Sequence, residues 1–436
     1  MRLAFKVFLV TLLLFMTNTW SGSIGSTPDL FAVQGQTRTR KIADNYPGRD
    51  LGEKINAADK DLGSSTGEIL VRAGGVISTQ VIINPGHTLR LAAGTYRLET
   101  ESDWEGGFLL KSRTTVVGSG WDTVIVEPPR TGWIVFQSFE DIRSKPIHYS
   151  GDSEIAISNL QIKGANPKTE GSVRSTIVLG NCRTCSVQNV WLNGTGVNGV
   201  LAGGSGLAGK FAENVTIKNN QFTHVTGQAV AVVNGRNVII DGNKFFDSGR
   251  AGAQGMTPID LEPNHSTDII QQIQITNNLI DSRGSSFLHG NGILVQNAVG
   301  SRAFGPVTVK GNTVIGGELA PNLAGNIAVG IYITSGTQDV TVTDNIVRRV
   351  AHSGIRLESS TRNYVANNRL VSTGTGGIYA FEVLNTTDSK ILNNIVSVDP
   401  NSPLGSSVIL ERGNSRGNTY TGNTDGRNPI SAARQN

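Results

Sequence analysis

The chain of 436 residues has little charge, few cysteines and, after its N-terminus, no long apolar run. Charged residues make up 17% of the chain, and the net charge is +4. Arg2 and Lys6 supply two of these charges, so the chain without an N-terminal leader carries +4 − 2 = +2. Such a weak positive charge argues against a nucleic-acid partner.

The only two cysteines lie three residues apart, at Cys182 and Cys185. A thioredoxin-like redox motif needs a helix after its first cysteine, whereas the surrounding pattern predicts a strand. We therefore expect a structural role, as thiols or as a local disulfide. No His, Asp and Glu cluster has a zinc spacing, so we predict no transition-metal site.

Residues 1–23 combine Arg2 and Lys6 with an apolar run over residues 7–16 and small residues at Ser21 and Ser23. This pattern predicts a secretory signal peptide and a secreted or periplasmic protein. A membrane anchor is the alternative, but the apolar run is short for a span. No later segment could cross a bilayer, so we predict no membrane span after leader removal.

A six-residue pattern organises most of the remaining sequence. In Ile217–Phe222 an apolar residue ends one strand, Asn219 and Asn220 turn the chain, and an apolar residue opens the next strand. Related hexads begin roughly 23 to 35 residues apart, a spacing typical of solenoid repeats. They start at residues 157, 187, 217, 240, 275, 309, 342, 365 and 391.

The fourth position of seven consecutive hexads is asparagine. Asparagine tolerates the left-handed conformation of a tight corner, and its amide can bond to the same amide in the coils above and below. The sequence therefore predicts an asparagine ladder inside the solenoid. Its members are Asn220, Asn243, Asn278, Asn312, Asn345, Asn368 and Asn394.

These hexads resemble those of the pectate lyase superfamily. The resemblance implies an all-β fold, a right-handed parallel β-helix with three sheets, and substrate binding on the outer face of the first strands. It covers residues 48–425 and also implies an N-terminal capping helix, which the apolar face of residues 49–62 supports. Residues 24–47 are predicted to be irregular and residues 426–436 to be a polar tail.

The first strands of the coils change character along the solenoid. With Ile259, Ile293, Ile331, Ile355 and Ile378 facing inward, alternation places the residues that follow them on the outer face. Earlier coils carry apolar residues there, whereas the later coils carry polar and aromatic ones. The outward set comprises Asp260, Leu294, Tyr332, Arg356 and Tyr379, followed two residues later by Glu262, Gln296, Thr334, Glu358 and Phe381.

Asp260 and Glu262 are the first candidate catalytic pair. Two residues apart on one strand, their Cα atoms should lie roughly 6.5 to 7 Å apart with both carboxylates on one face. That spacing could suit either glycosidase geometry. It could also hold Ca²⁺, or be a solvated acidic strand.

Arg356 and Tyr332 are the second candidate pair, about three coils or ~14 Å from Asp260. Arg356 could neutralise a uronate carboxylate while Tyr332 removes the proton from C5, with Tyr379 and Glu358 beside them. The alternative is a purely structural ion pair between Arg356 and Glu358.

Long loops, residues 248–258, 282–292 and 316–330, should wall a groove over these strands. His289 and His352 lie just before two of the strands and could act as acid or base. Gln296, Glu358, Tyr379, His289 and His352 are accordingly candidate substrate-binding residues.

Complete reaction motifs of the family are absent. Thr257–Asp260 does not match the Asp-Pro-His-Asp motif of alginate epimerases, and the calcium-binding Asp cluster of pectate lyases is not evident. Asn423–Asp425 has the Asn-Thr-Asp sequence of polygalacturonases, but it falls in the tail and the match looks accidental. We expect a polysaccharide partner and favour β-elimination on a uronate polymer, ahead of hydrolysis by Asp260 and Glu262 and of a non-catalytic glycan-binding solenoid. The oligomeric state stays open, with a monomer as one alternative.

Overall fold

The computed structural model describes residues 39–100, 106–128, 134–138, 151–164, 175–204, 209–249, 256–285, 289–317, 327–374, 379–398 and 406–435. The expected signal peptide, residues 1–23, and Ile378 lie outside these ranges. Among the described residues, no helix is long and apolar enough to cross a membrane.

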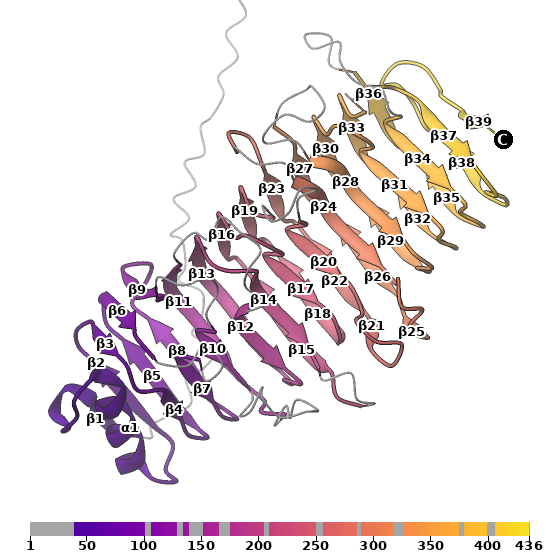
Figure 1. The fold of residues 1–436 in the computed structure, drawn as a ribbon. Coiled ribbons are helices and arrows are strands. Elements are labelled where there is room, and N and C mark those ends of the chain that lie inside the picture. Colours follow the sequence, from indigo (N-terminus) through magenta and orange to yellow (C-terminus); the bar gives the residue numbers. More distant parts are fainter. Residues whose placement is uncertain are drawn as a thin grey trace, which may run out of the picture. The chain divides into compact units, whose positions relative to one another are not determined.

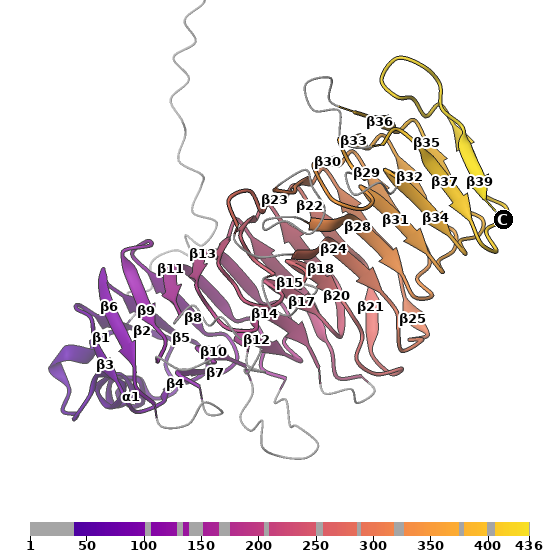
Figure 2. The same cartoon turned by 45° about the horizontal axis from the view of Figure 1, so that its top comes forward.

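The strands stack in parallel along a solenoid, as Figures 1 and 2 show. The first strand of each coil joins one 13-stranded sheet. Its strands are β4 (Val81–Ile83), β7 (Phe108–Leu110), β10 (Phe136–Gln137), β12 (Ser175–Gly180), β14 (Asn198–Gly203), β17 (Val230–Val232), β20 (Ile259–Leu261), β24 (His289–Gln296), β28 (Ile327–Thr334), β31 (Ile355–Glu358), β34 (Phe381–Leu384), β37 (Ile409–Arg412) and β39 (Ala432–Gln435).

The other strands form a second sheet of two ladders that meet at the asparagine corners. The leading ladder, before the corner, contains β1 (Thr39–Ile42), β2 (Gly67–Val71), β5 (His87–Leu91), β8 (Thr115–Gly118), β11 (Ala156–Lys163), β13 (Ser186–Asn193), β15 (Ala212–Lys218), β18 (Gly235–Asp241), β21 (Ile269–Gln271), β22 (Ile273–Thr276), β25 (Ala303–Phe304), β26 (Val307–Lys310), β29 (Val340–Thr343), β32 (Tyr364–Ala366), β35 (Lys390–Leu392) and β38 (Thr419–Thr421). The trailing ladder, after the corner, contains β3 (Gly75–Ile77), β6 (Gly94–Leu98), β9 (Thr123–Val126), the second halves of β11 and β13, β16 (Gln221–Thr223), β19 (Lys244–Phe246), β23 (Leu279–Asp281), β27 (Thr313–Ile315), β30 (Ile346–Arg348), β33 (Arg369–Val371) and β36 (Ile395–Ser397). The predicted parallel solenoid with three strand stacks is confirmed.

The corners follow the chemistry of the hexad. Its third residue is left-handed, with φ of 55° at both Asn219 and Asn277. Its fourth residue is buried, and each amide bonds to two neighbouring coils. Asn243 Nδ2, for example, donates to the Ile217 carbonyl at 2.9 Å and to Asn278 Oδ1 at 3.0 Å. The predicted asparagine ladder is confirmed.

The ladder has one more member than the sequence predicted. Asn394 Nδ2 donates to Asn423 Oδ1 at 3.0 Å, so the supposedly accidental Asn423 is a buried corner residue. The coil around it lies within the predicted solenoid, residues 48–425, but its place in the ladder was missed because its exposed strand β38 carries few apolar residues.

Both ends of the described solenoid are more regular than expected. The helix α1 (Leu51–Leu62) packs against β1 to β4, and Asp50 caps it by accepting a hydrogen bond from the Glu53 amide at 2.9 Å. The expected capping helix is thus present. The segment 24–47, expected to be irregular, contains β1 and the 3₁₀ turn η1 (Ala43–Asn45), and the expected tail 426–436 contains β39, which pairs with β37. Backbone pairing and ion pairs such as Arg40–Glu68 and Arg434–Glu411 hold these polar strands, which lack the apolar alternation on which the prediction relied.

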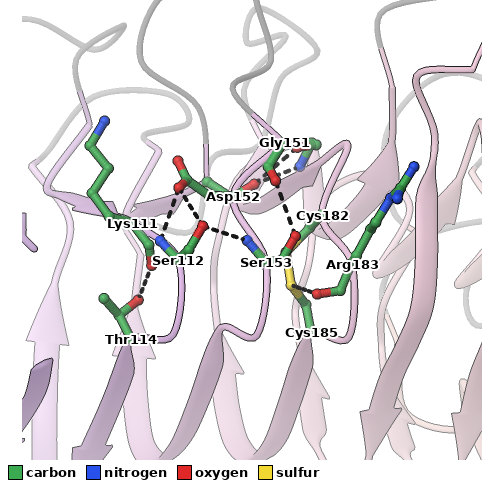
Figure 3. The surroundings of a disulfide bond; sticks show 11 residues. Lys111, Ser112, Thr114, Gly151, Asp152, Ser153, Cys182, Arg183 and Cys185 are labelled. Carbon is green, nitrogen blue, oxygen red and sulfur yellow. Dashed lines mark hydrogen bonds between the residues drawn. A yellow bond between two sulfur atoms is a disulfide. The ribbon is translucent and has the colours of Figure 1, made fainter. Parts of the chain in front are cut away.

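Cys182 and Cys185 form a disulfide across the turn that enters β13 (Figure 3). Both side chains are buried in the core, and Arg183 at the turn points outward. The neighbouring turn is held by Asp152, whose Oδ1 accepts hydrogen bonds from the amide and hydroxyl of Ser112 at 2.9 and 2.8 Å. The expected structural role of the cysteines is confirmed.

Candidate active site on the 13-stranded sheet

The outer face of the 13-stranded sheet presents the predicted residues in register. Asp260 pairs with Leu294, Leu294 with Tyr332 and Tyr332 with Arg356 on successive strands. The intervening Ile259, Ile293, Ile331 and Ile355 are buried inside the solenoid. The alternation therefore correctly predicted which side chains of these four strands point outward and which point into the core.

The next strand differs from the prediction by three residues. Phe381, not Ile378, aligns with Ile355, so Glu382, not Tyr379, stands beside Arg356. Phe381 was expected on the outer face but is fully buried. The Gly377–Ile378 pair imitates Gly330–Ile331 within β28 and Gly354–Ile355 at the start of β31. The strand instead forms on the later alternation of Phe381, Val383 and their polar neighbours. Tyr379 lies before β34, outside the row that it was predicted to join.

Asp260 and Glu262 form a carboxyl pair at the end of β20. Asp260 is only 4% exposed although it faces outward. Its Oδ2 accepts a hydrogen bond from Gln228 Nε2 at 3.2 Å, and its Oδ1 has no donor among the described residues. The side chain of Glu262 is in hydrogen-bond contact with that of Asp260. Two carboxyl groups can make such a bond only if one of them holds a proton.

The environment favours that proton. Burial, and next the charge of Glu262, raise the pKa of Asp260 to about 8, against a smaller lowering by the Gln228 hydrogen bond. Burial also raises the pKa of Glu262, which its hydrogen bond to Asp260 partly offsets. The pair therefore holds a proton at neutral pH. The two carboxyl groups are thus in direct contact, an arrangement that the spacing of the Cα atoms alone did not predict.

Ca²⁺ takes six to eight oxygen ligands, and the described contacts of the Asp260 side chain include one further carboxyl group, that of Glu262, and the Gln228 amide. No group of three or more potential metal ligands occurs in the described parts of the chain.

Arg356 lies three strands from Asp260 within a second polar cluster. Its Nη2 is 2.8 Å from Glu358 Oε2, and its Nε is 3.2 Å from Glu382 Oε2. Arg412 pairs with the other oxygen of Glu382, which is 1% exposed. Two arginines thus face two glutamates, and the guanidinium of Arg356 is committed to protein carboxylates.

Tyr332 is tied to the same cluster. Its hydroxyl donates to Glu358, and its ring lies under Arg356, with the guanidinium carbon 5.3 Å from the ring centre. Burial and the bond to Glu358 raise the pKa of Tyr332, although Thr334 and Arg356 oppose them. A raised phenol pKa makes Tyr332 a poor base at neutral pH.

The remaining predicted residues divide between structure and surface. His289 is buried, with Nδ1 3.0 Å from the Ser248 carbonyl and Nε2 3.0 Å from Ser285 Oγ, so it ties two loops together. His352 is half-buried near Arg356, and burial followed by the charge of Arg356 lowers its pKa, against the opposing effect of Glu382. Gln296 pairs with Thr334 and lies half-buried beside the Asp260 strand.

Sequence reasoning missed Glu382, Arg412 and Gln228. Glu382 had a signal, because it follows the apolar Phe381 in a strand that alternates. Arg412 follows Glu411 in β37, so no apolar neighbour marks it. Gln228 precedes its strand β17, so no alternation marks it.

Comparison with known proteins agrees with this architecture. The family model described as "Right handed beta helix region" matches residues 146–321. The chain is a right-handed parallel β-helix. No curated protein is similar enough in sequence to count as a relative.

Several solved β-helix structures resemble this one at low sequence identity. The α-1,3-glucanase catalytic unit from Streptomyces thermodiastaticus superposes with a TM-score of 0.59 at 14% identity, covering 92% of this chain and 70% of that one. The A-module of the mannuronan C-5 epimerase AlgE6 from Azotobacter vinelandii gives 0.54 at 13%, covering 90% and 95%. A tailspike capsular polysaccharide depolymerase from the Acinetobacter baumannii bacteriophage Fri1 gives 0.52 at 13%, covering 91% and 63%. At these identities the similarity establishes the β-helix fold and no activity.

Proposed function

We propose that this β-helix is an exported polysaccharide hydrolase whose proton donor is the Asp260–Glu262 pair. The observation that carries the proposal is the buried, hydrogen-bonded carboxyl pair on the outer face of the 13-stranded sheet. Glycoside hydrolysis needs a carboxylic acid that stays protonated near neutral pH, and burial of Asp260 supplies that condition.

In the proposed reaction the pair donates its proton to the glycosidic oxygen as the bond from that oxygen to the anomeric carbon breaks. A water molecule adds to the anomeric carbon and gives up a proton to the carboxylate of Glu262. Because the two carboxyl groups are in contact, substrate or water must enter between them to reach a hydrolase separation. Glu262 can move to allow this, since it lies beyond the end of β20 and is only half-buried. Proton loss from the pair would also drive the two carboxylates apart.

β-Elimination is the second candidate, because the half-buried His352 lies near Arg356 and its lowered pKa leaves a neutral imidazole that could act as a base. The two ion pairs of Arg356 weigh against it. Elimination on a uronate needs a cation for the substrate carboxylate, whereas Glu358 and Glu382 already neutralise Arg356 and Arg412.

Export is part of the proposal. Its support is the N-terminal pattern of residues 1–23 together with the Cys182–Cys185 disulfide, since disulfides persist in oxidising compartments. The polysaccharide class is supported by the activities of fold neighbours such as the α-1,3-glucanase and the capsular polysaccharide depolymerase.

The test is a screen of residues 24–436 against neutral glycans and uronic-acid polymers, following reducing ends and the near-ultraviolet absorbance of unsaturated uronates together. The proposal expects new reducing ends without absorbance, and their loss in Asp260→Asn. Rising absorbance would replace hydrolysis with elimination. If neither new reducing ends nor absorbance appeared while binding was retained, a non-catalytic glycan-binding protein would be favoured.

A further inference from the structure

A hollow lies on the trailing ladder, on a different sheet from the proposed active site. It has a volume of about 460 Å³, within the ~300–1,000 Å³ range of small-molecule sites. The strands β6, β9, β11 and β13 form its floor through outward-facing side chains. Those that matter here are Arg97, Val124, Val126, Gln161, Lys163 and Asn193.

Two tryptophans lie beside this hollow. Trp191 pairs with the lining residue Gln161 on the adjacent strand. Trp121, from the corner before β9, reaches Trp191 with ring centres 5.4 Å apart. Trp121 is 37% exposed and also borders a smaller hollow with Asp122 and Asn189.

The indole N–H groups of both tryptophans are already used. Trp121 Nε1 donates to the Asn189 carbonyl at 3.1 Å, and Trp191 Nε1 donates to Thr223 Oγ1 at 3.0 Å. These bonds and the contact between the two rings fix the indoles, and the exposed part of Trp121 offers apolar surface to a ligand. A fixed indole face beside polar donors suits a sugar ring, whose C–H groups stack on the indole while its hydroxyls bond to amides.

One part of the hollow is cationic. Arg97 and Lys163 both pair in register with Val126, so they flank the same strand β9. Both are exposed, and neither forms an ion pair with a described carboxylate. The carboxyl group of Glu127, next to Val126, does not offset them, because its burial raises its pKa to about 8. Among the described residues that line the two hollows, the one exposed carboxylate is Asp122, which borders the smaller hollow beside Trp121.

We propose that this surface, the Trp121–Trp191 platform with Arg97 and Lys163, is a binding site for a segment of acidic polysaccharide, separate from the catalytic face. Three strand spacings separate β6 from β13, so the site spans ~14 Å along the solenoid axis. A sugar would stack on the tryptophans while carboxylates further along the chain pair with Arg97 and Lys163. Such a site would hold a polymer on the enzyme between cleavage events, and it does not depend on which reaction occurs at Asp260.

Affinity electrophoresis in gels containing polygalacturonate, alginate or neutral dextran tests the site. The Arg97→Gln/Lys163→Gln double variant should bind the acidic polymers at least about tenfold more weakly, which is ~1.4 kcal/mol. Trp121→Ala should weaken binding as well, whereas the charge-matched control Arg369→Gln/Lys390→Gln, on exposed residues of distant coils, should not. Asp260→Asn should bind like the wild type, which separates this proposal from the proposed reaction.

Three results would overturn the proposal. These are no retardation of the wild type by either acidic polymer, affinities of the site variants within about twofold of the wild type, or an equal loss in the control pair. Thermal unfolding of each variant identifies any loss that comes from misfolding. In that event polymer binding is measured with the milder Trp121→Phe and Arg97→Lys/Lys163→Arg variants. These variants should retain binding if the site is real and the fold is intact.

Discussion

Gln228 Nε2 donates to Asp260 Oδ2 at 3.2 Å from the coil that precedes Asp260. This neutral amide is the only donor to the Asp260 carboxyl group among the described hydrogen bonds, and no cation pairs with it there. Asp260 is therefore poorly compensated as an anion, and the proton that it shares with Glu262 is part of the folded state.

Folding stability should consequently fall as pH rises. The pKa of Asp260 is about 8 when folded and near its ordinary value of 3.8 when unfolded. Stability is then fully present below pH 4 and is lost between pH 4 and 8, at up to ~1.4 kcal/mol per pH unit. Asp260→Asn removes this dependence. At pH 7.5 the free energy of unfolding of the variant should exceed that of the wild type by ~2 kcal/mol or more, so the variant should unfold at a higher denaturant concentration. A variant equally stable at pH 7.5, or less stable, would show that Asp260 is ionised in the folded protein.

Removing the Gln228 amide should move the alkaline limit of activity. The Gln228 hydrogen bond favours ionised Asp260, so Gln228→Leu raises the pKa of Asp260 further. If protonated Asp260 is the acid, the descending limb of the pH–rate profile shifts upward by roughly half a unit to one unit. Gln296→Leu, one strand on the other side of β20, is the matched control. An unchanged limb, or a shift to lower pH, would contradict the role of Asp260.

The Arg356 cluster should contribute to stability more than to turnover. Arg356→Met leaves the buried Glu382 with Arg412 as its one remaining arginine partner among the described ion pairs, and should destabilise the fold by ~2–4 kcal/mol. Adding Glu382→Gln should restore part of that loss, which a double-mutant cycle in urea measures. If Arg356→Met abolished activity without changing the free energy of unfolding, the cation would serve substrate, and elimination would regain support.

Substitution of an asparagine in the middle of the ladder should destabilise the fold more than substitution at its end. Asn312 donates to three carbonyl or amide oxygens and accepts from two nitrogens of Asn278, so Asn312→Ala leaves several buried groups unpaired. We expect a loss of ~3 kcal/mol or more. Asn423→Ala, at the last described rung, breaks fewer bonds and should cost less. Equal losses at both positions would argue against cooperative bonding along the ladder.

The sequence predicted what the corners and alternation determine. The chemistry of Asn219 and Asn220 predicts a tight left-handed corner. The alternation around Ile293, Ile331 and Ile355 predicts the inner face without any long-range information. Tyr379 was misplaced because a Gly-Ile pair precedes the true strand by three residues, and only pairing with β31 selects Phe381.

The candidate site was less predictable for a related reason. Side-chain alternation put Asp260 on the outer face, but alternation does not predict how exposed a side chain on that face is, and Asp260 is only 4% exposed. The same limit hid the contact between Asp260 and Glu262, because the backbone spacing fixes the two Cα atoms and leaves the carboxyl groups free to meet. The neutralisation of Arg356 by Glu382 depended on the register of β34.

The most direct test of Asp260 as the proton donor compares two substrates of one sugar. The natural polymer needs protonation of its leaving oxygen, whereas the corresponding glycosyl fluoride does not. Asp260→Asn should lower kcat/KM on the polymer by ~10²-fold or more and on the fluoride by less than ~10-fold. Equal losses on both substrates, or full activity on the polymer, would contradict the assignment of Asp260 as the acid.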